Sequence, residues 1–400
     1  MSTAGIICEY NPYHRGHAYQ TAELRRRCPD AAVVCVLSGG FVQRGEPAML
    51  PTDIRAEAAL FCGADLVLLL PFPWSMGPAE CFARAGTAIL SAVGCEMIAF
   101  GTEGDVLPVL QSAAAHLSSS EFEAALGTAL ADAENAGVGY PALRDSIYRR
   151  LYGDAEADIL RTPNNLLAAE YLRAAPKLSP LAIPRIGDAH GSVSAGTETA
   201  SSTAVRALLS AGKTEAALAL LPPPSAQCAA RAEKEGRLVF ADSSAASALL
   251  LRHFRTADKA ELARCAGLSG GLAGRLCSAA AEAAELSAFF SLAATKKYTD
   301  AAVRRAAWYG FFGVTEEEIR GTPPFVQVLA LNARGAEILH AAKKSTPVPI
   351  LSRPAAYKNL PAEAQTAFLR NVHAEAVREL LCARPRSFAE LLRSAPFSGL

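Results

Sequence analysis

The sequence lacks the features of a disulfide-stapled, membrane-embedded or strongly charged protein. Its ten cysteines include no Cys-x-x-Cys pair, which favours buried free thiols in a reducing compartment over a zinc site or a disulfide framework. Lys+Arg and Asp+Glu both number 39, so net charge neither predicts nor excludes a nucleic-acid partner. The most apolar run, 64–74, contains Asp65 and two prolines and is too short to span a membrane. No signal peptide precedes the first apolar segment, so we expect a cytoplasmic protein without a membrane partner.

The amino-acid composition is that of an ordinary folded protein. With 400 residues, 51% hydrophobic and 20% charged, two domains are the natural expectation. Strand-like and helix-like stretches alternate in the first half: the former are residues 3–10, 31–40, 64–71 and 95–103, and the latter 16–27, 51–63 and 78–94. Because both faces of the strands are apolar, this pattern predicts an α/β fold, a Rossmann-like parallel sheet with helices on both faces.

The remainder of the chain is mainly helical in pattern. Helical periodicity dominates 105–175 and most of the chain after 228, with a break at 343–354 that can hold a short strand. The segment 221–227 (LPPPSAQ) has the composition of a linker. We therefore expect a catalytic domain over 1–220 and a mainly α-helical C-terminal domain over 228–400.

His14 and His17 surround Gly16 directly after the first predicted strand, in the sequence HRGH. Gly16 lets the backbone approach a ligand closely, and the N-terminus of the following helix favours an anion. Two imidazoles there can stabilise charge during nucleotidyl transfer at a phosphate. A chance pairing of two surface or core histidines is the alternative. Since ligands of parallel sheets bind beyond the carboxyl ends of the strands, the position favours a phosphate site.

A second phosphate-suited element is SSTAVR, at residues 201–206. Ser201 or Ser202 can cap a helix N-terminus, and Arg206 projects one turn later. Taken alone, this is better interpreted as an N-cap followed by a solvated arginine. Beside the HRGH element, it becomes a clamp for leaving phosphates.

HRGH and SSTAVR resemble the HxGH and Ser/Thr-x-x-Arg motifs that hold ATP in the nucleotidyltransferase superfamily. More narrowly, the chain is similar to the bacterial tRNA(Met) cytidine acetate ligase family over nearly its whole length. The similarity lies in EYNPYHRGH, LSGGFVQRGEPA, RAEAALFCGADLVLLLP, FGTEGD, TPNNLLAAEYL, PRIG, TKKYTDAAVRRA and PPFVQVLALNARGAEIL. Two departures are Tyr13, where phenylalanine is common, and Gly40, where a polar residue is common. The second is expected to weaken a contact near the nucleotide.

The resemblance implies an enzyme that activates acetate with ATP, releasing pyrophosphate, and then acetylates N4 of the wobble cytidine of elongator tRNA(Met). It implies catalytic roles for His14, His17 and Arg206. ATP is the expected co-substrate with Mg²⁺, for which no dedicated carboxylate cage is evident. The residues expected to bind ATP are Ile7, Cys8, Glu9, Tyr10, Asn11, Pro12, Tyr13, His14, Arg15, Gly16, His17, Ala18, Tyr19, Gln20, Gly101, Asn164, Asn165, Arg185 and Ile186. Which of Asn164 and Asn165 contacts ATP stays open, as does the oligomeric state.

Residues 295–312 are the expected RNA-binding segment, because basic residues alternate there with aromatic ones. The basic residues are Lys296, Lys297, Arg304 and Arg305. For Tyr298 and Trp308, a place in the core of an amphipathic helix is an equally good interpretation.

Three further sets of residues have weaker signals. Arg44, in the glycine-rich segment 38–48, is expected to cover the site, with an exposed turn as the alternative. Asp53 and Arg55 are more simply interpreted as a helix cap and a surface salt-bridging residue. His190, just after PRIG, is a weak candidate for the site.

Three rival functions remain open. A nucleotidyltransferase for a small phosphorylated metabolite would leave the helical half without a role. A non-catalytic RNA-binding protein would not need His14, His17 and Arg206. A class I aminoacyl-tRNA synthetase would normally carry a KMSKS-like loop, which ATKKYT matches poorly.

Overall fold

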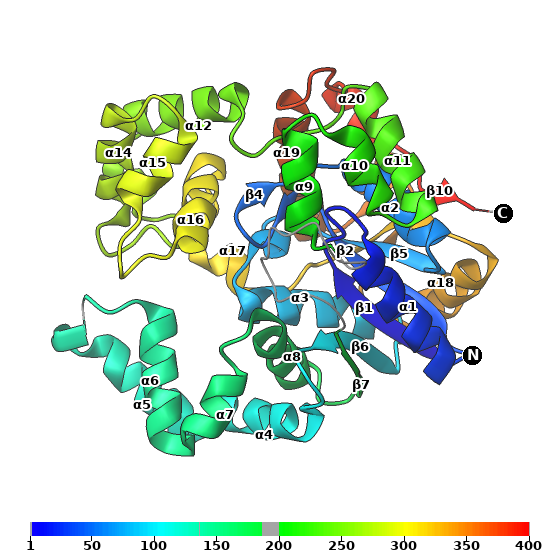
Figure 1. Cartoon of the computed structure of the whole chain (residues 1–400), viewed down its shortest axis with the longest axis horizontal. Helices are drawn as coiled ribbons and strands as arrows, with labels where there is room; N and C mark the ends of the chain where they lie inside the picture. Colours follow the sequence, from blue (N-terminus) through cyan, green and yellow to red (C-terminus); the bar gives the residue numbers. More distant parts are fainter. Residues whose placement is uncertain (1, 136, 186–199, 400) are drawn as a thin grey trace.

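The computed structural model describes residues 2–135, 137–185 and 200–399. Within these ranges the core is an eight-stranded sheet in the order β10-β8-β5-β2-β1-β6-β7, with β9 beside β8 (Figure 1). Neighbouring strands run parallel except β5 and β8, which are antiparallel. The strands are β1 (Thr3–Cys8), β2 (Ala32–Ser38), β5 (Leu66–Leu70), β6 (Met97–Thr102), β7 (Ser179–Pro184), β8 (Val326–Leu331), β9 (Ile350–Leu351) and β10 (Phe397–Ser398).

Helices cover both faces of this sheet. The nearest are α1 (Arg15–Arg27), α2 (Thr52–Phe61), α3 (Ala79–Ala92) and α8 (Pro163–Ala174). Val34 packs with residues of α3 and α8, whereas its neighbour Val33 packs with residues of α1 and α2. Successive side chains thus enter opposite apolar layers, as the pleat of a strand requires. The predicted fold, a parallel sheet with helices on both faces, is confirmed.

Two groups of helices lie beside the sheet. The first consists of α4 (Leu107–Leu117), α5 (Ser120–Ala131), α6 (Tyr140–Tyr152) and α7 (Asp154–Ile159). The second consists of α12 (Ser244–Thr256), α13 (Lys259–Leu262), α14 (Leu272–Glu282), α15 (Leu286–Ala293), α16 (Asp300–Phe312) and α17 (Glu316–Arg320). Figure 1 shows α14–α16 and α5–α6 as separate bodies on the same side of the molecule.

The second helical group is joined to the sheet through a short hairpin of β3 (Phe41–Val42) and β4 (Glu46–Pro47). Phe41 packs edge-on against Trp308 of α16, with ring centroids 4.9 Å apart, and both rings are fully buried. Trp308 is therefore a core residue, so the core interpretation of this aromatic side chain holds.

The remaining helices surround the sheet and carry the chain to its C-terminus. They are α9 (Ser202–Ser210), α10 (Thr214–Ala219), α11 (Pro223–Lys234), α18 (Ala333–Ser345), α19 (Ala362–Leu380) and α20 (Phe388–Arg393). The linker expected at 221–227 is wrong, because α11 begins at Pro223. Proline is tolerated in the first turn of a helix, where its missing N–H has no helical partner.

The C-terminal part of the chain also contributes to the central sheet. Strand β8 pairs with β5, and β9 and β10 both pair with β8. The short strand anticipated within 343–354 is β9. The division into domains 1–220 and 228–400 stays a prediction. No helix in the part of the chain that the structure describes has the length and apolar character needed to cross a membrane.

Candidate active site

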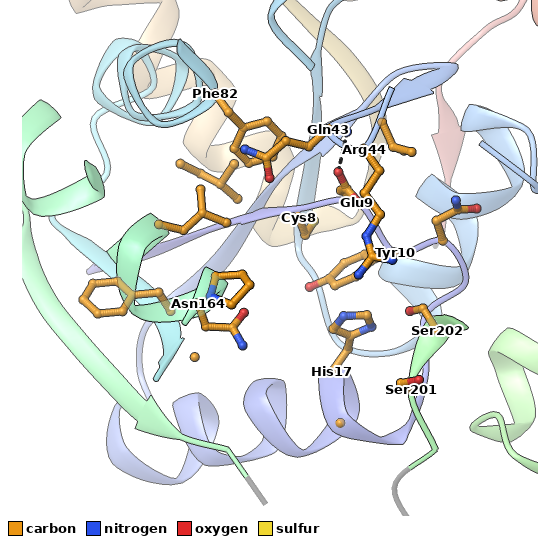
Figure 2. Close-up of a pocket in the computed structure, with 18 of the residues that line it drawn as sticks. Cys8, Glu9, Tyr10, His17, Gln43, Arg44, Phe82, Asn164, Ser201 and Ser202 are labelled. Atoms are coloured by element: carbon orange, nitrogen blue, oxygen red, sulfur yellow. Dashed lines mark hydrogen bonds between the residues drawn. The ribbon is translucent and has the colours of Figure 1, made fainter. Parts of the chain in front are cut away.

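A cavity of about 670 Å³ opens beyond the carboxyl ends of the parallel strands (Figure 2). Four helices direct their N-terminal residues into it: α1 with His14 and Gly16, α8 with Asn164, α9 with Ser201 to Thr203, and α16 with Thr299. Among the described residues, its charged lining consists of five arginines and two glutamates, namely Arg44, Arg161, Arg185, Arg206, Arg305, Glu9 and Glu46. Because helix N-termini and arginines attract anions, the cavity is a positive site in a chain of zero net charge.

His14 and His17 form a capping box at the start of α1. The backbone N–H of Gly16 donates to Nδ1 of His14 (3.0 Å), and the N–H of His14 donates to Nδ1 of His17 (3.2 Å). The two rings stack with centroids 3.8 Å apart. Since both Nδ1 atoms accept hydrogen bonds, a neutral ring in either position carries its proton on Nε2.

The electrostatic surroundings keep His17 neutral. Burial, the neighbouring His14 and Arg185 hold the pKa of His17 well below its ordinary value. The ring lies against Tyr10, with centroids 4.8 Å apart, and Figure 2 shows it rising from α1 towards Tyr10. His17 can thus serve as a neutral hydrogen-bond donor whose orientation is fixed by the helix terminus.

The SSTAVR segment packs against the loop that precedes α1. Ser201 caps α9 by accepting from the N–H of Ala204 (3.3 Å), and Ser202 donates to the carbonyl of Pro12 (3.3 Å). Arg206 donates to the carbonyl of Asn11 (2.9 Å), and burial lowers its pKa. The interpretation as a mere solvated arginine is therefore wrong, because Arg206 is packed onto the histidine loop and lines the cavity.

The opposite wall has a glycine and one of the two candidate asparagines. A side chain at Gly101 would begin 3.5 Å from the Arg185 side chain, so glycine keeps the wall open. Asn164 lines the cavity, whereas Asn165 is 2% exposed and accepts from the N–H of Glu103 (2.8 Å). Asn164 is accordingly the asparagine that can reach a ligand.

The β3–β4 hairpin forms a further wall. The N–H of Gln43 donates to Glu9 (2.7 Å), shown dashed in Figure 2, and burial raises the pKa of Glu9. Arg44 is exposed and lines the cavity, as expected for a residue that covers the site. Gly45 has φ +77°, and a Cβ there would lie 2.5 Å from the backbone nitrogen of Arg305. The hairpin thus packs directly on α16.

The predicted RNA-binding residues occupy different surroundings. Lys296 is exposed, and the Lys297 ammonium lies 5.3 Å from the centre of the Tyr298 ring. Arg304 is ion-paired with carboxylates, and Arg305 lines the cavity. Their predicted contact with RNA stays a prediction.

Three expectations, for Arg55 and Asp53 of α2 and for Gly40, are wrong. Arg55 is not on the surface but 1% exposed, and it donates to the carbonyls of Glu9, Ser38, Gly39 and Leu50. Burial lowers its pKa to about 10. Asp53 does not cap α2 but pairs with Arg237 (2.9 Å) and Arg386 (3.0 Å).

Gly40 is the third of these. It does not line the cavity, and its N–H donates to Glu375 of α19 (2.7 Å). A Cβ at this position would lie 2.9 Å from the Glu375 carboxylate, so glycine favours this contact and does not weaken one to the nucleotide.

Of the residues predicted to bind ATP, most line the cavity. These are Ile7, Cys8, Glu9, Tyr10, Asn11, His14, Gly16, His17, Tyr19, Gln20, Gly101, Asn164 and Arg185. Those that lie behind or beside its wall are Pro12, Tyr13, Arg15, Ala18 and Asn165. Ile186 and His190 lie outside the described residues. The nucleotide-binding assignments stay predictions.

Sequence reasoning missed the part of the cavity formed by α3 and the start of α16. Ala79 and Phe82 line it without any motif to mark them, and Thr299 lies in the segment 295–312 that was expected to contact RNA and not the cavity. Their helical periodicity indicates only that they belong to helices. Among the described residues, no group of three histidine, cysteine, aspartate or glutamate side chains is placed to hold a metal ion.

Comparison with known proteins agrees with this geometry. The model of the family described as HIGH Nucleotidyl Transferase matches residues 1–389. A tRNA(Met) cytidine acetate ligase of Lysinibacillus sphaericus is 32% identical over 368 residues, covering 89% of this chain and 90% of the relative. The ligase of the same name from Listeria monocytogenes is 32% identical over 359 residues, covering 88% and 89%.

Solved structures give the same result. The crystal structure of Thermotoga maritima TmcAL bound with alpha-thio ATP is similar with a TM-score of 0.88 and 26% identity. The alignment covers 100% of this chain and 99% of that one. The apo form of the Thermotoga maritima protein gives a TM-score of 0.90 at the same identity and coverage.

Proposed function

The chain belongs to the HIGH nucleotidyltransferase family and, within it, to the tRNA(Met) cytidine acetate ligases, and we propose that it is an ATP-dependent ligase acting on elongator tRNA(Met). It activates acetate as acetyl-adenylate and transfers the acetyl group to N4 of the wobble cytidine. The observation that carries this proposal is the cavity at the strand ends, where His14, His17 and Arg206 meet.

In the first step, a carboxylate oxygen of acetate attacks the α-phosphorus of ATP. The new O–P bond forms as the bond to the β-phosphate breaks, and pyrophosphate leaves with the electron pair. His14 and His17 donate Nε2–H to the phosphate oxygens where charge increases, and Arg206 balances the charge of the leaving pyrophosphate. Acetate is itself the nucleophile, so positioning and charge stabilisation supply the rate.

In the second step, N4 of the cytidine attacks the acetyl carbon, and AMP leaves with the electrons of the broken C–O bond. The proton lost from N4 must pass to a base. In this proposal the nucleoside part of ATP lies against Gly101 and Asn164, a placement supported by their position in the cavity lining. Lys296 and Lys297, on the segment that enters α16, are the proposed contacts with tRNA phosphates.

Two further points complete the proposal. Among the described residues, the cavity lining has two carboxylates, Glu9 and Glu46, and Glu9 already accepts a backbone hydrogen bond. Glu46 is therefore the carboxylate that could help hold a Mg²⁺ ion entering with ATP, which would neutralise charge on the triphosphate. The reaction takes place in the cytoplasm, with tRNA as the macromolecular partner.

The test is ATP–pyrophosphate exchange by the purified, RNA-free protein, with and without acetate. Acetate-dependent exchange is expected, and total tRNA added to the mixture should then acquire N4-acetylcytidine. Exchange with a small phosphorylated metabolite in place of acetate would favour the alternative transferase. If the protein shows no exchange and forms no acetylcytidine when tRNA is present, the proposal is contradicted.

A further inference from the structure

Two adjacent arginines of α16 differ in how their charge is balanced. Arg304 faces three carboxylates, Asp300 at 2.8 Å, Asp242 at 3.6 Å and Glu46 at 3.7 Å. Arg305 has no carboxylate within ion-pair distance among the described residues. Its one hydrogen bond found there is NH1 to the carbonyl of Gln43 (3.1 Å).

Arg305 also lies on the cavity, whereas Arg304 does not. The Arg305 side chain is half-buried, and this burial lowers its pKa. A cation removed from water without a counter-charge is unfavourable, and such groups in proteins are usually paired or bind a ligand. The missing partner is therefore expected to be an anion that enters the cavity.

The surroundings of Arg305 indicate the size of that anion. The hydrogen bond from Arg305 to the carbonyl of Gln43 places the guanidinium next to the end of β3, where Val42 lines the cavity. Ala79 and Phe82, in the first turns of α3, line the same cavity. A half-buried cation in a cavity that these apolar side chains also line matches a carboxylate with a short alkyl group.

We infer that Arg305 and the apolar wall of Ala79, Phe82 and Val42 form the site for the acetate carboxylate and methyl group. This inference rests on the proposed function and adds to it the location of the acyl donor. Acetate held there by its carboxylate lies on the hairpin side of the cavity. In the view of Figure 2, Phe82 and Gln43 lie on the side opposite His17.

The other anions have better places in the molecule. The triphosphate matches the α1 and α9 N-termini with His14, His17 and Arg206. An RNA phosphodiester matches the exposed Lys296, since a half-buried guanidinium inside the cavity is less accessible to a polymer backbone. Arg305 is thus assigned to the small carboxylate.

The experiment is to measure ATP–pyrophosphate exchange against acetate concentration for the wild type, Arg305→Lys and Arg305→Gln. Removal of a charged hydrogen-bond donor is expected to raise the KM for acetate roughly 10- to 100-fold in Arg305→Gln. Arg305→Lys, which keeps the charge without the planar fork, should show a smaller rise. The Kd for ATP, from calorimetry, should stay within roughly twofold of the wild type, because the phosphates lie elsewhere.

A second variant tests the apolar wall without altering charge. Phe82→Ala enlarges the space beside Arg305 and should shift the preferred donor from acetate towards propionate or butyrate. Arg264→Ala is the matched control, because Arg264 is 76% exposed in the same helical group and remote from the cavity lining. Arg264→Ala should leave the KM for acetate and the Kd for ATP unchanged.

The inference is overturned if Arg305→Gln weakens ATP binding while the acetate KM is unchanged, which would place Arg305 on the nucleotide. It is equally overturned if exchange is normal and only tRNA acetylation falls, which would place Arg305 on RNA. If either Arg305 variant fails to fold, the donor preference of Phe82→Ala decides, and an unchanged preference counts against the inference. Absence of acetate-dependent exchange in the wild type would instead reject the proposed function.

Discussion

The α1 end of the cavity takes its polar groups from one short stretch of chain, whereas the α16 end takes them from segments far apart in sequence. At the α1 end, His14, Gly16 and His17 bond to one another across three positions. At the α16 end, Arg305 donates to the carbonyl of Gln43 from 262 positions away. Outside the cavity lining, Glu375 of α19 accepts from Gly40, which precedes the hairpin, from 335 positions away. The first end is organised by a helix terminus, and the second exists only when the whole fold is assembled.

This difference predicts how substitutions at each end should affect activity and stability. A local motif depends on its own few side chains, so loss of one removes chemistry but little stability. A wall formed by distant segments depends on tight backbone contacts, so a small change there should reduce stability as well as activity.

The largest effect is expected at the α1 end. His17→Ala removes a neutral donor placed to face the phosphates, and the rate of acetate-dependent exchange should fall about 10²- to 10³-fold. Circular dichroism should still show a folded protein. His340→Ala, at an exposed position on α18, is the control and should keep the wild-type rate. A loss of less than about tenfold in His17→Ala would mean that the motif does not serve catalysis.

The second prediction concerns the backbone contact between the hairpin and α16. In Gly45→Ala the new Cβ meets the backbone of Arg305 at 2.5 Å in a left-handed conformation, so stability should fall by about 2 kcal/mol or more. Gly212→Ala is the matched control, with φ +69° but nothing within 4 Å, and should cost about 1 kcal/mol. Urea denaturation of both variants measures the difference. Equal losses would show that the hairpin does not depend on close packing with α16.

The smallest effect concerns pH. Burial lowers the pKa of His17 below its unfolded value of about 6.5, so the unfolded chain binds more protons as pH falls. The stability from neutral His17 is thus present above about pH 6.5 and lost as pH falls towards the lowered folded pKa. Between about pH 7 and pH 5, Tm should fall a few degrees more in the wild type than in His17→Gln, which does not titrate. If Tm falls equally with pH in the wild type and in His17→Gln, then His17 is solvated and not buried.

The same contrast explains what could be predicted from the sequence. The strands β1, β2, β5 and β6 are continuous apolar runs, and the HRGH motif is local, so both were readable from neighbouring residues. Strand β8 was not, because its pairing with β5 depends on contacts across most of the chain.

The surroundings of Arg55 and Arg305 could not be predicted from the sequence either. Arg55 has Asp53 and Glu57 close by in sequence, which suggests a surface ion pair. Its burial is instead made possible by four backbone carbonyls from three separate segments. Arg305 could be read only as one charge in a basic run, because its surroundings come from the hairpin and from α3.

The hydrogen bond from Gly40 to Glu375 has a consequence for the time at which the enzyme becomes active. At ribosomal rates of about 5–20 residues per second, the 335 positions between them take roughly 20 to 70 s to synthesise. Throughout that interval a nascent chain already carries its complete histidine loop, while the hairpin still lacks its anchor. A chain terminated before α19 would therefore retain the nucleotide motif and lack a finished acyl-donor wall, so activity is conferred only on chains that are nearly complete.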